Sequence, residues 1–236
     1  MWWIAVVVIA VVVLLVIVVA IAANGKDSSD GGTYFHHDST SRTITDWDQQ
    51  EINYVGQEGE NYVAKNLAAL ASNYNGFLFN DFCFEDEEGY STEIDHILIT
   101  RGGVFVIETK TNKGTIYGDK DDEYWDCIKK EYQEDKKLKN PIIQNQGHIN
   151  HLRRVFGKNA PKMFSIIIFP IADVSNIDSN LVYGLDDAIV AIKNMTDAAK
   201  YSQEFVNRVN NQLIMIRDQY GISKQRHIDN INKKYN

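Results

Sequence analysis

The feature that most constrains the fold is a pair of apolar segments, residues 93–100 and 103–110, separated by only Arg101 and Gly102. Both segments are rich in the branched and aromatic side chains that favour strands. Two such segments joined by two turn residues predict an antiparallel β-hairpin. Because a two-residue turn fixes the register, the sequence also predicts which side chains of the two strands face each other.

Charged side chains interrupt both strands of this predicted hairpin. The two-residue turn places Asp95 opposite Glu108 and Glu93 opposite Lys110, and alternation along each strand turns all four side chains to one face of the sheet. Acids and an ammonium group on one sheet face are costly unless they hold a cation or a substrate. The hairpin therefore predicts a metal site with oxygen ligands.

The order of an Asp, a hairpin turn and then Glu-Thr-Lys resembles the PD-(D/E)xK nuclease superfamily, and within it the nuclease-related domain family, NERD. The resemblance runs from about Gly56 to Phe169. The motifs that carry it are, in order, Gly59-Glu60, Ile94-Asp95-His96, Val106-Ile107-Glu108-Thr109-Lys110, Lys113-Gly114, Trp125 and Asn140-Pro141 followed by Gln144. This resemblance implies a restriction-endonuclease-like α/β fold, in which a mixed sheet is flanked by helices.

The resemblance also implies a set of metal ligands. Asp95 and Glu108, together with the backbone carbonyl of Thr109, would hold Mg²⁺, and Mn²⁺ is the alternative ion. Glu60 matches an acidic residue of the first helix that often points into the metal site of the superfamily, although an acid in a first turn is also stabilised by the helix dipole alone. Two metals are possible, with Glu60 or Glu93 as a further ligand.

The catalytic residues implied by the resemblance are Asp95, Glu108, Lys110 and Gln144. Lys110 would orient a water molecule for in-line attack on a phosphodiester, and Gln144 would orient the phosphate or that water. His148 and His151 follow Gln144 at helical spacing, and they are either exposed helical histidines or further phosphate ligands.

A nucleic-acid substrate, DNA more than RNA, follows from the resemblance, whereas the charge of the chain supports it only in part. The net charge is −8, which excludes a protein that binds nucleic acid through its overall charge. The region from Lys110 to Lys158 holds 11 Lys and Arg against eight acids, whereas the region from Asp27 to Asp95 holds 15 acids and two basic residues. The basic residues either line a substrate groove or are simply solvated.

The first 23 residues contain no charged side chain. As a helix they would span roughly 34 Å, enough for a hydrocarbon core of about 30 Å, so residues 1–23 are predicted to be a transmembrane anchor. A cleaved signal peptide is the alternative, because Ala20-Ile21-Ala22 resembles a cleavage site, but the basic region that should precede it is missing. Lys26 favours a single-pass protein of the cell membrane with its domain in the cytoplasm.

The rest of the chain divides into three predicted regions, which are a flexible tether at residues 24–50, a NERD-like domain at residues 51–220 and a C-terminal tail at residues 221–236. Cys83 and Cys127 are expected to be buried free thiols, and a disulfide is the alternative. Within the domain, apolar spacing predicts helices at 57–71 and 196–220. Asn140 as the N-cap and Pro141 at the first position predict a third helix, at 141–156. Strands are predicted at 77–84, 115–117 and 124–128 besides the hairpin, and the continuously apolar run at 165–169 predicts a strand covered on both faces.

Two functions remain open from the sequence. The first is a membrane-anchored, metal-dependent nuclease that hydrolyses phosphodiester bonds. The second is a membrane-tethered module that keeps the nuclease fold and binds nucleic acid or a protein without cutting. The intact set of Asp, Glu and Lys favours the nuclease, and the acidic balance of the chain favours the module.

Overall fold

The predicted hairpin is the centre of the main sheet in the computed structural model. Strands β2 (Ser91–Thr100) and β3 (Gly103–Thr109) pair antiparallel around a turn at Arg101 and Gly102. The partners run from Thr100↔Gly103 to His96↔Ile107, which is the register that a two-residue turn requires. The predicted hairpin and its register are confirmed.

The structure describes residues 46–129 and 136–235, with side chains at residues 56–129 and 136–233. The predicted transmembrane anchor, residues 1–23, and most of the predicted tether lie outside these residues. The last part of the tether is helical instead, because helix α2 (Asp46–Asn73) begins there. Within the described ranges, no helix is both long and apolar enough to cross a bilayer.

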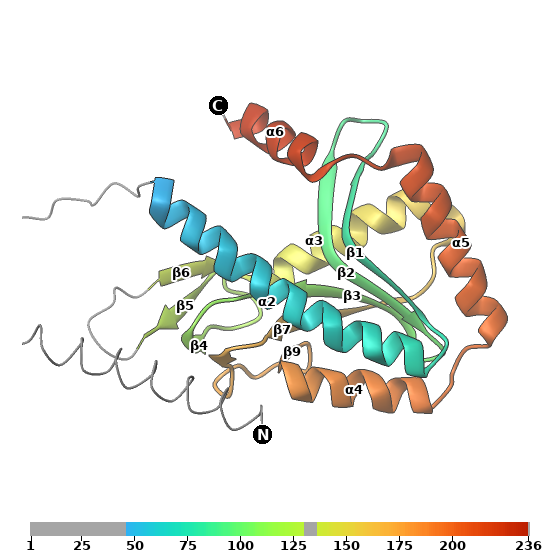
Figure 1. Ribbon diagram of the computed structural model, residues 1–236, viewed down its shortest axis with the longest axis horizontal. Coiled ribbons are helices and arrows are strands. Elements are labelled where there is room, and N and C mark those ends of the chain that lie inside the picture. The colour runs from blue at the N-terminus through green and yellow to red at the C-terminus, as the bar shows by residue number, and fades with distance from the viewer. Residues whose placement is uncertain (1–45, 130–135, 236) are drawn as a thin grey trace, which may run out of the picture. The chain divides into compact units, whose positions relative to one another are not determined.

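Two mixed sheets flanked by helices make this an α/β fold (Figure 1). In the main sheet the strand order is β1-β2-β3-β7-β9, with β1 antiparallel to β2 and the last two strands parallel to β3. The remaining strands of this sheet are β1 (Phe77–Glu85), β7 (Met163–Phe169) and β9 (Val182–Gly184). The apolar run of β7 lies between β3 and β9, which agrees with its predicted position as a strand covered on both faces.

Helices cover both faces of the main sheet. Helix α2 and helix α4 (Leu185–Asp197) bury Leu67 and Ile192 against one face. Helix α3 (Pro141–Phe156) and helix α5 (Gln203–Tyr220) bury Leu152 and Leu213 against the other. Because helices cover both faces of the sheet, its central strands need apolar side chains on both faces. This explains why the hairpin strands carry so few polar residues outside the site.

A smaller sheet packs beside the end of β7, in the strand order β6-β5-β4-β8. Its core contains Trp125 and Cys127, which form one buried cluster with Phe169 of β7. The Trp125 ring requires glycine at Gly118, where φ is 156° and an added Cβ would lie 2.2 Å from the ring. The strands are β4 (Gly114–Tyr117), β5 (Tyr124–Ile128), β6 (Lys136–Lys139) and β8 (Ala172–Asp173).

Helix α3 begins as its sequence predicts. The side chain of Asn140 accepts hydrogen bonds from the backbone N–H groups of Ile142 and Ile143, at 2.9 and 3.4 Å, and Pro141 is the first helical residue. The helix ends at Phe156, and Gly157 follows with a φ of 68°. Local capping chemistry therefore sets both ends of the helix that carries Gln144.

The single long helix predicted at residues 196–220 is wrong. Helix α4 ends at Asp197, Ala199 adopts a left-handed φ of 47°, and α5 starts at Gln203. The hydroxyl of Ser202 accepts a hydrogen bond from the backbone N–H of Phe205, so a new cap replaces helix continuation. Apolar spacing alone does not reveal such a break, because the stripe continues into α5.

Residues 221–236, expected to form a C-terminal tail, contain helix α6 (Lys224–Tyr235). The helix packs against β1 and β2, and its His227 is buried. The two cysteines, Cys83 and Cys127, are both buried and are not joined in a disulfide, as predicted. Burial raises the pKa of the Cys83 thiol to about 12, which leaves it protonated and unreactive at neutral pH.

Candidate active site

The site lies where strands β2 and β3 part. Their ladder ends at His96 and Ile107, one residue before Asp95 and Glu108. At the next position the carboxylate of Asp95 accepts a hydrogen bond from the backbone N–H of Thr109, at 2.7 Å. A side chain thus takes the place of a backbone partner, which brings the Asp95 carboxylate to the end of β3.

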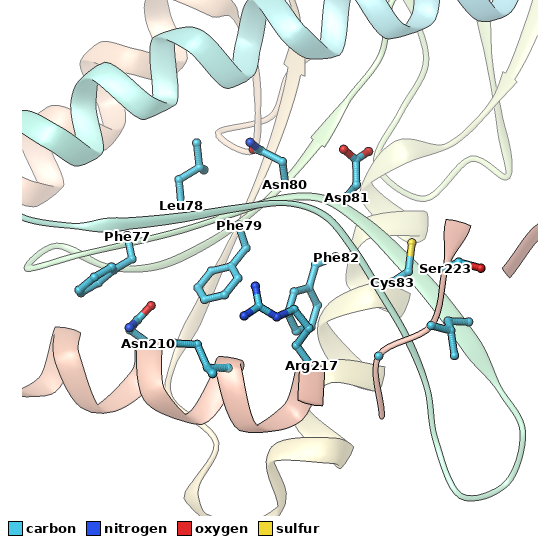
Figure 2. Close-up of a pocket in the computed structure, with 13 residues that line it drawn as sticks. Phe77, Leu78, Phe79, Asn80, Asp81, Phe82, Cys83, Asn210, Arg217 and Ser223 are labelled. Carbon is cyan, nitrogen blue, oxygen red and sulfur yellow. The ribbon is translucent and has the colours of Figure 1, made fainter. Parts of the chain in front are cut away.

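The alternation of side chains breaks at this point in both β1 and β2. Ile94 and Ile97 pack into the same core cluster, although strict alternation would separate them. In β1, Asp81 has a left-handed φ of 48°, and Figure 2 shows Asn80 and Asp81 on the side opposite Phe82. Simple alternation therefore does not hold along β1 and β2 at the site, and the predicted common face of Glu93, Asp95, Glu108 and Lys110 stays a prediction.

Glu108 is the centre of a hydrogen-bond network at the end of β3. Only 3% of this residue is exposed. Its Oε1 accepts hydrogen bonds from Lys110 Nζ at 2.6 Å and from Gln144 Nε2 at 2.8 Å, and Lys110 Nζ also donates to Gln144 Oε1 at 3.0 Å. His148 Nε2 lies 3.4 Å from the other oxygen of Glu108. The structure thus brings together three of the four predicted catalytic residues.

The two predicted ligand carboxylates have opposite pKa shifts. Burial by itself raises the pKa of Glu108, but Lys110 and His148 outweigh burial and hold that pKa below its usual value. Burial raises the pKa of Asp95 well above its usual range, and the charge of Glu108 raises it further. Because one carboxylate strongly affects the other, a cation between them would stabilise both in the charged form.

Glu60 belongs to the same electrostatic environment. Burial raises its pKa, the ammonium of Lys224 lowers it, and Asp81, Glu93 and Glu108 raise it again. Glu60 belongs to helix α2, which packs against strands β1, β2 and β3. The prediction that the first helix brings an acid near the hairpin acids agrees with this geometry, and its role as a metal ligand stays a prediction.

The predicted pairing of Glu93 with Lys110 is wrong. Glu93 Oε1 lies 2.5 Å from Lys224 Nζ of α6, whereas Lys110 binds Glu108 and Gln144. β2 follows β1 away from β3 beyond His96, so the two charged residues are no longer neighbours. No signal in the sequence links Lys224 to this site, because the contact joins residues 131 positions apart, as their numbers show.

His151, the second predicted histidine, lies outside this network. Its Nε2 is 2.9 Å from Asp86 Oδ2, and its Nδ1 is 2.5 Å from the hydroxyl of Thr92. The ring also packs against Phe84, with centroids 4.6 Å apart. His151 therefore joins α3 to the far end of the β1–β2 hairpin, and its role is structural.

The carboxylates of the site suit one Mg²⁺ ion that keeps part of its water shell better than they suit a metal held entirely by protein ligands. Across residues 46–129 and 136–235, no group of three or more His, Cys, Asp and Glu side chains is arranged to hold a metal. Mg²⁺ needs fewer protein ligands, since it usually keeps several waters and binds one or two carboxylates together with substrate phosphates. Asp95 and Glu108 supply two hard oxygen donors of this kind.

Comparison with known proteins identifies a family for the middle of the chain. The model of the family described as NERD, nuclease-related domain, matches residues 55–170. An uncharacterized protein of Bacillus anthracis is 27% identical over 125 residues, which cover 53% of this chain and 58% of that protein. The chain thus spans less than two thirds of the length of this relative. No solved structure matches.

Proposed function

Because residues 55–170 are a nuclease-related domain of the PD-(D/E)xK-like superfamily, we propose that the protein is a metal-dependent nuclease that hydrolyses phosphodiester bonds. The observation that supports this most is the contact of Lys110 Nζ with both Glu108 and Gln144, beside the carboxylate of Asp95. An ammonium, an amide and two carboxylates at the end of parting strands are groups suited to orienting a phosphate and a water molecule.

Each residue has a distinct part in this proposal. Asp95 and Glu108 would hold Mg²⁺ or Mn²⁺, and the carbonyl of Thr109 would be a third oxygen donor. The ion, when bound, neutralises charge that develops on the phosphate and lowers the pKa of a coordinated water. Lys110 orients the attacking water, and Gln144 fixes the ammonium of Lys110 through its amide oxygen.

The substrate we propose is nucleic acid, with DNA favoured over RNA. Exposed basic side chains lie on β6 and on the outer side of α3, at Lys136, Lys137, Lys139, Arg153 and Arg154. In a chain with a net charge of −8, such local clusters must provide the attraction to phosphate. Binding is therefore expected to weaken steeply as salt concentration rises.

We also propose that residues 1–23 anchor the protein in the cell membrane with the domain in the cytoplasm. The support is the uncharged run of 23 residues followed by Lys26. Alkaline carbonate extraction should leave the full chain in the membrane pellet. Recovery of a mature protein that begins near Ala23 or Asn24 would instead establish cleavage of a signal peptide.

Nuclease activity is tested by incubating the purified full chain with DNA and RNA panels in Mg²⁺, in Mn²⁺ and in EDTA. We expect cleavage that EDTA abolishes. Asp95→Ala and Lys110→Ala should each remove most of it, and the double variant should be little worse, because groups that act as one catalytic unit are strongly non-additive. Lys193→Ala, an exposed lysine paired with Asp197 on α4, is the matched control.

A different outcome would favour the second function. If the full chain binds nucleic acid, cuts no substrate with either metal, and binds equally well as Asp95→Ala, the protein is a non-catalytic binding module on a nuclease fold. Absence of both binding and cleavage would contradict the nucleic-acid substrate altogether.

A further inference from the structure

Helix α6 brings a basic residue to the acidic site from outside the matched domain. Lys224 is the first residue of α6 and follows the family match, which ends at residue 170. Its ammonium lies 2.5 Å from Glu93 Oε1 and 3.5 Å from Asp81 Oδ1. The charge of Lys224 also acts on Glu60 of α2. Lys224 therefore forms ion pairs with acids of β1 and β2 and acts electrostatically on a third acid, in α2.

The position of this ammonium is fixed by contacts that do not involve Lys224 itself. Arg226 donates two hydrogen bonds to Glu85, at 3.0 and 3.3 Å, and Asn230 donates a third at 2.9 Å. His227 Nδ1 lies 2.8 Å from the hydroxyl of Ser91. Helix α6 is thereby attached to both strands of the β1–β2 hairpin, beside which Figure 1 shows it.

The linker before α6 is attached to the same hairpin. The backbone N–H of Ile222 donates to the carbonyl of Cys83 at 3.2 Å, and the hydroxyl of Ser223 accepts from the N–H of Arg226. Residues 221–223 also line a cavity of about 810 Å³ between β1 and α5 (Figure 2). Because the helix start is capped and its linker is bonded to β1, Lys224 enters the site from a defined direction.

Charge is distributed unequally over the two sides of the site. On the β3 side, Glu108 is bound by Lys110, and Asp95 has a backbone N–H as its partner. On the β1 side, Asp81 and Glu93 are bound by Lys224. A divalent ion close to Glu93 would have to approach the ammonium of Lys224 or displace it, and like charges at such short range repel strongly.

We propose that Lys224 is a positioning residue, whose ammonium holds Glu93 and Asp81 in ion pairs. These ion pairs limit the site to one divalent ion, at Asp95 and Glu108. The inference rests on the proposed metal-dependent function. Lys224 itself supplies the second positive charge of the site. Its removal frees the two carboxylates to accept a second ion.

The test is the number of Mn²⁺ ions bound by the full chain, measured from the free-ion signal in electron paramagnetic resonance. Wild type and the control Lys193→Met should bind one ion. Lys224→Met should bind two, and the double variant with Glu93→Gln should return to one. Lys224→Gln removes the charge but keeps a hydrogen-bond donor to Glu93, so it should also bind two if the methionine variant does not fold.

The outcomes separate this inference from the proposed function. If wild type binds two ions, or if both neutral variants at Lys224 bind as many as wild type, the inference is overturned. Asp95→Ala in the wild-type background should lose the one ion, and its failure to do so contradicts the proposed metal site. If wild type binds no ion, the proposed metal site fails and the one-ion inference fails with it, whereas two ions in wild type overturn the inference alone.

Discussion

Asn140 provides the sharpest test of how the fold positions Gln144. The residue is fully buried. Its side-chain oxygen caps α3, and its amide nitrogen donates to the carbonyls of Asp119, Lys120 and Asp122, at 3.3, 3.0 and 2.6 Å. One side chain thus ties the loop at residues 119–122 to the first turn of the helix that carries Gln144.

Replacement by alanine removes both functions of this side chain. Loss of an N-cap costs about 1 kcal/mol. Carbonyl groups left without a buried donor cost about 1–3 kcal/mol more. We therefore expect Asn140→Ala to lower the free energy of unfolding by about 2–4 kcal/mol, which for a domain of this size lowers Tm by roughly 5–15 °C.

Asn140→Asp separates the two contributions. Aspartate keeps the capping oxygen, but it cannot donate to the three carbonyls and places a negative charge against them. We expect it to destabilise the full chain at least as much as alanine, in urea unfolding followed by circular dichroism. Ser202→Ala, which removes an exposed cap from α5, is the control and should cost only about 1 kcal/mol. An aspartate variant within about 0.5 kcal/mol of wild type would refute the reasoning, because a change that small is ordinary for a neutral surface site.

Three further predictions concern buried side chains. Burial lowers the pKa of His151 in the folded chain, so that on acidification this imidazole is protonated first in the unfolded chain. The free energy of unfolding should therefore fall as pH drops below about 6.5. Denaturant unfolding at several pH values should show a smaller fall for His151→Gln. Cys83 and Cys127 should resist a thiol reagent in the native chain and react as two thiols in guanidinium, whereas a disulfide would give none. Leu67→Ala, at a fully buried position of α2, should cost about 2–5 kcal/mol in unfolding free energy, whereas Tyr62→Ala, at a residue that is 55% exposed, should cost far less.

The sequence determined the features that depend on near neighbours in the chain. A two-residue turn fixes the register of β2 and β3, because a turn of that length determines which residues of the two strands pair. Asn140-Pro141 fixes the start of α3 through a local cap. The apolar run in β7 requires cover on both faces, which the fold provides. The family resemblance, confirmed over residues 55–170, rests on short motifs in a fixed order, such as Val106-Ile107-Glu108-Thr109-Lys110.

The tertiary structure alone decided how the charged residues of the site meet. The left-handed backbone at Asp81 and the parting of β2 from β3 override simple alternation, because packing of two core clusters sets which face each strand presents. The ion pair of Glu93 with Lys224 depends on α6 folding back onto the hairpin. Local propensity carries no information about such a contact, since its energy comes from groups that only the completed fold brings within a few ångströms.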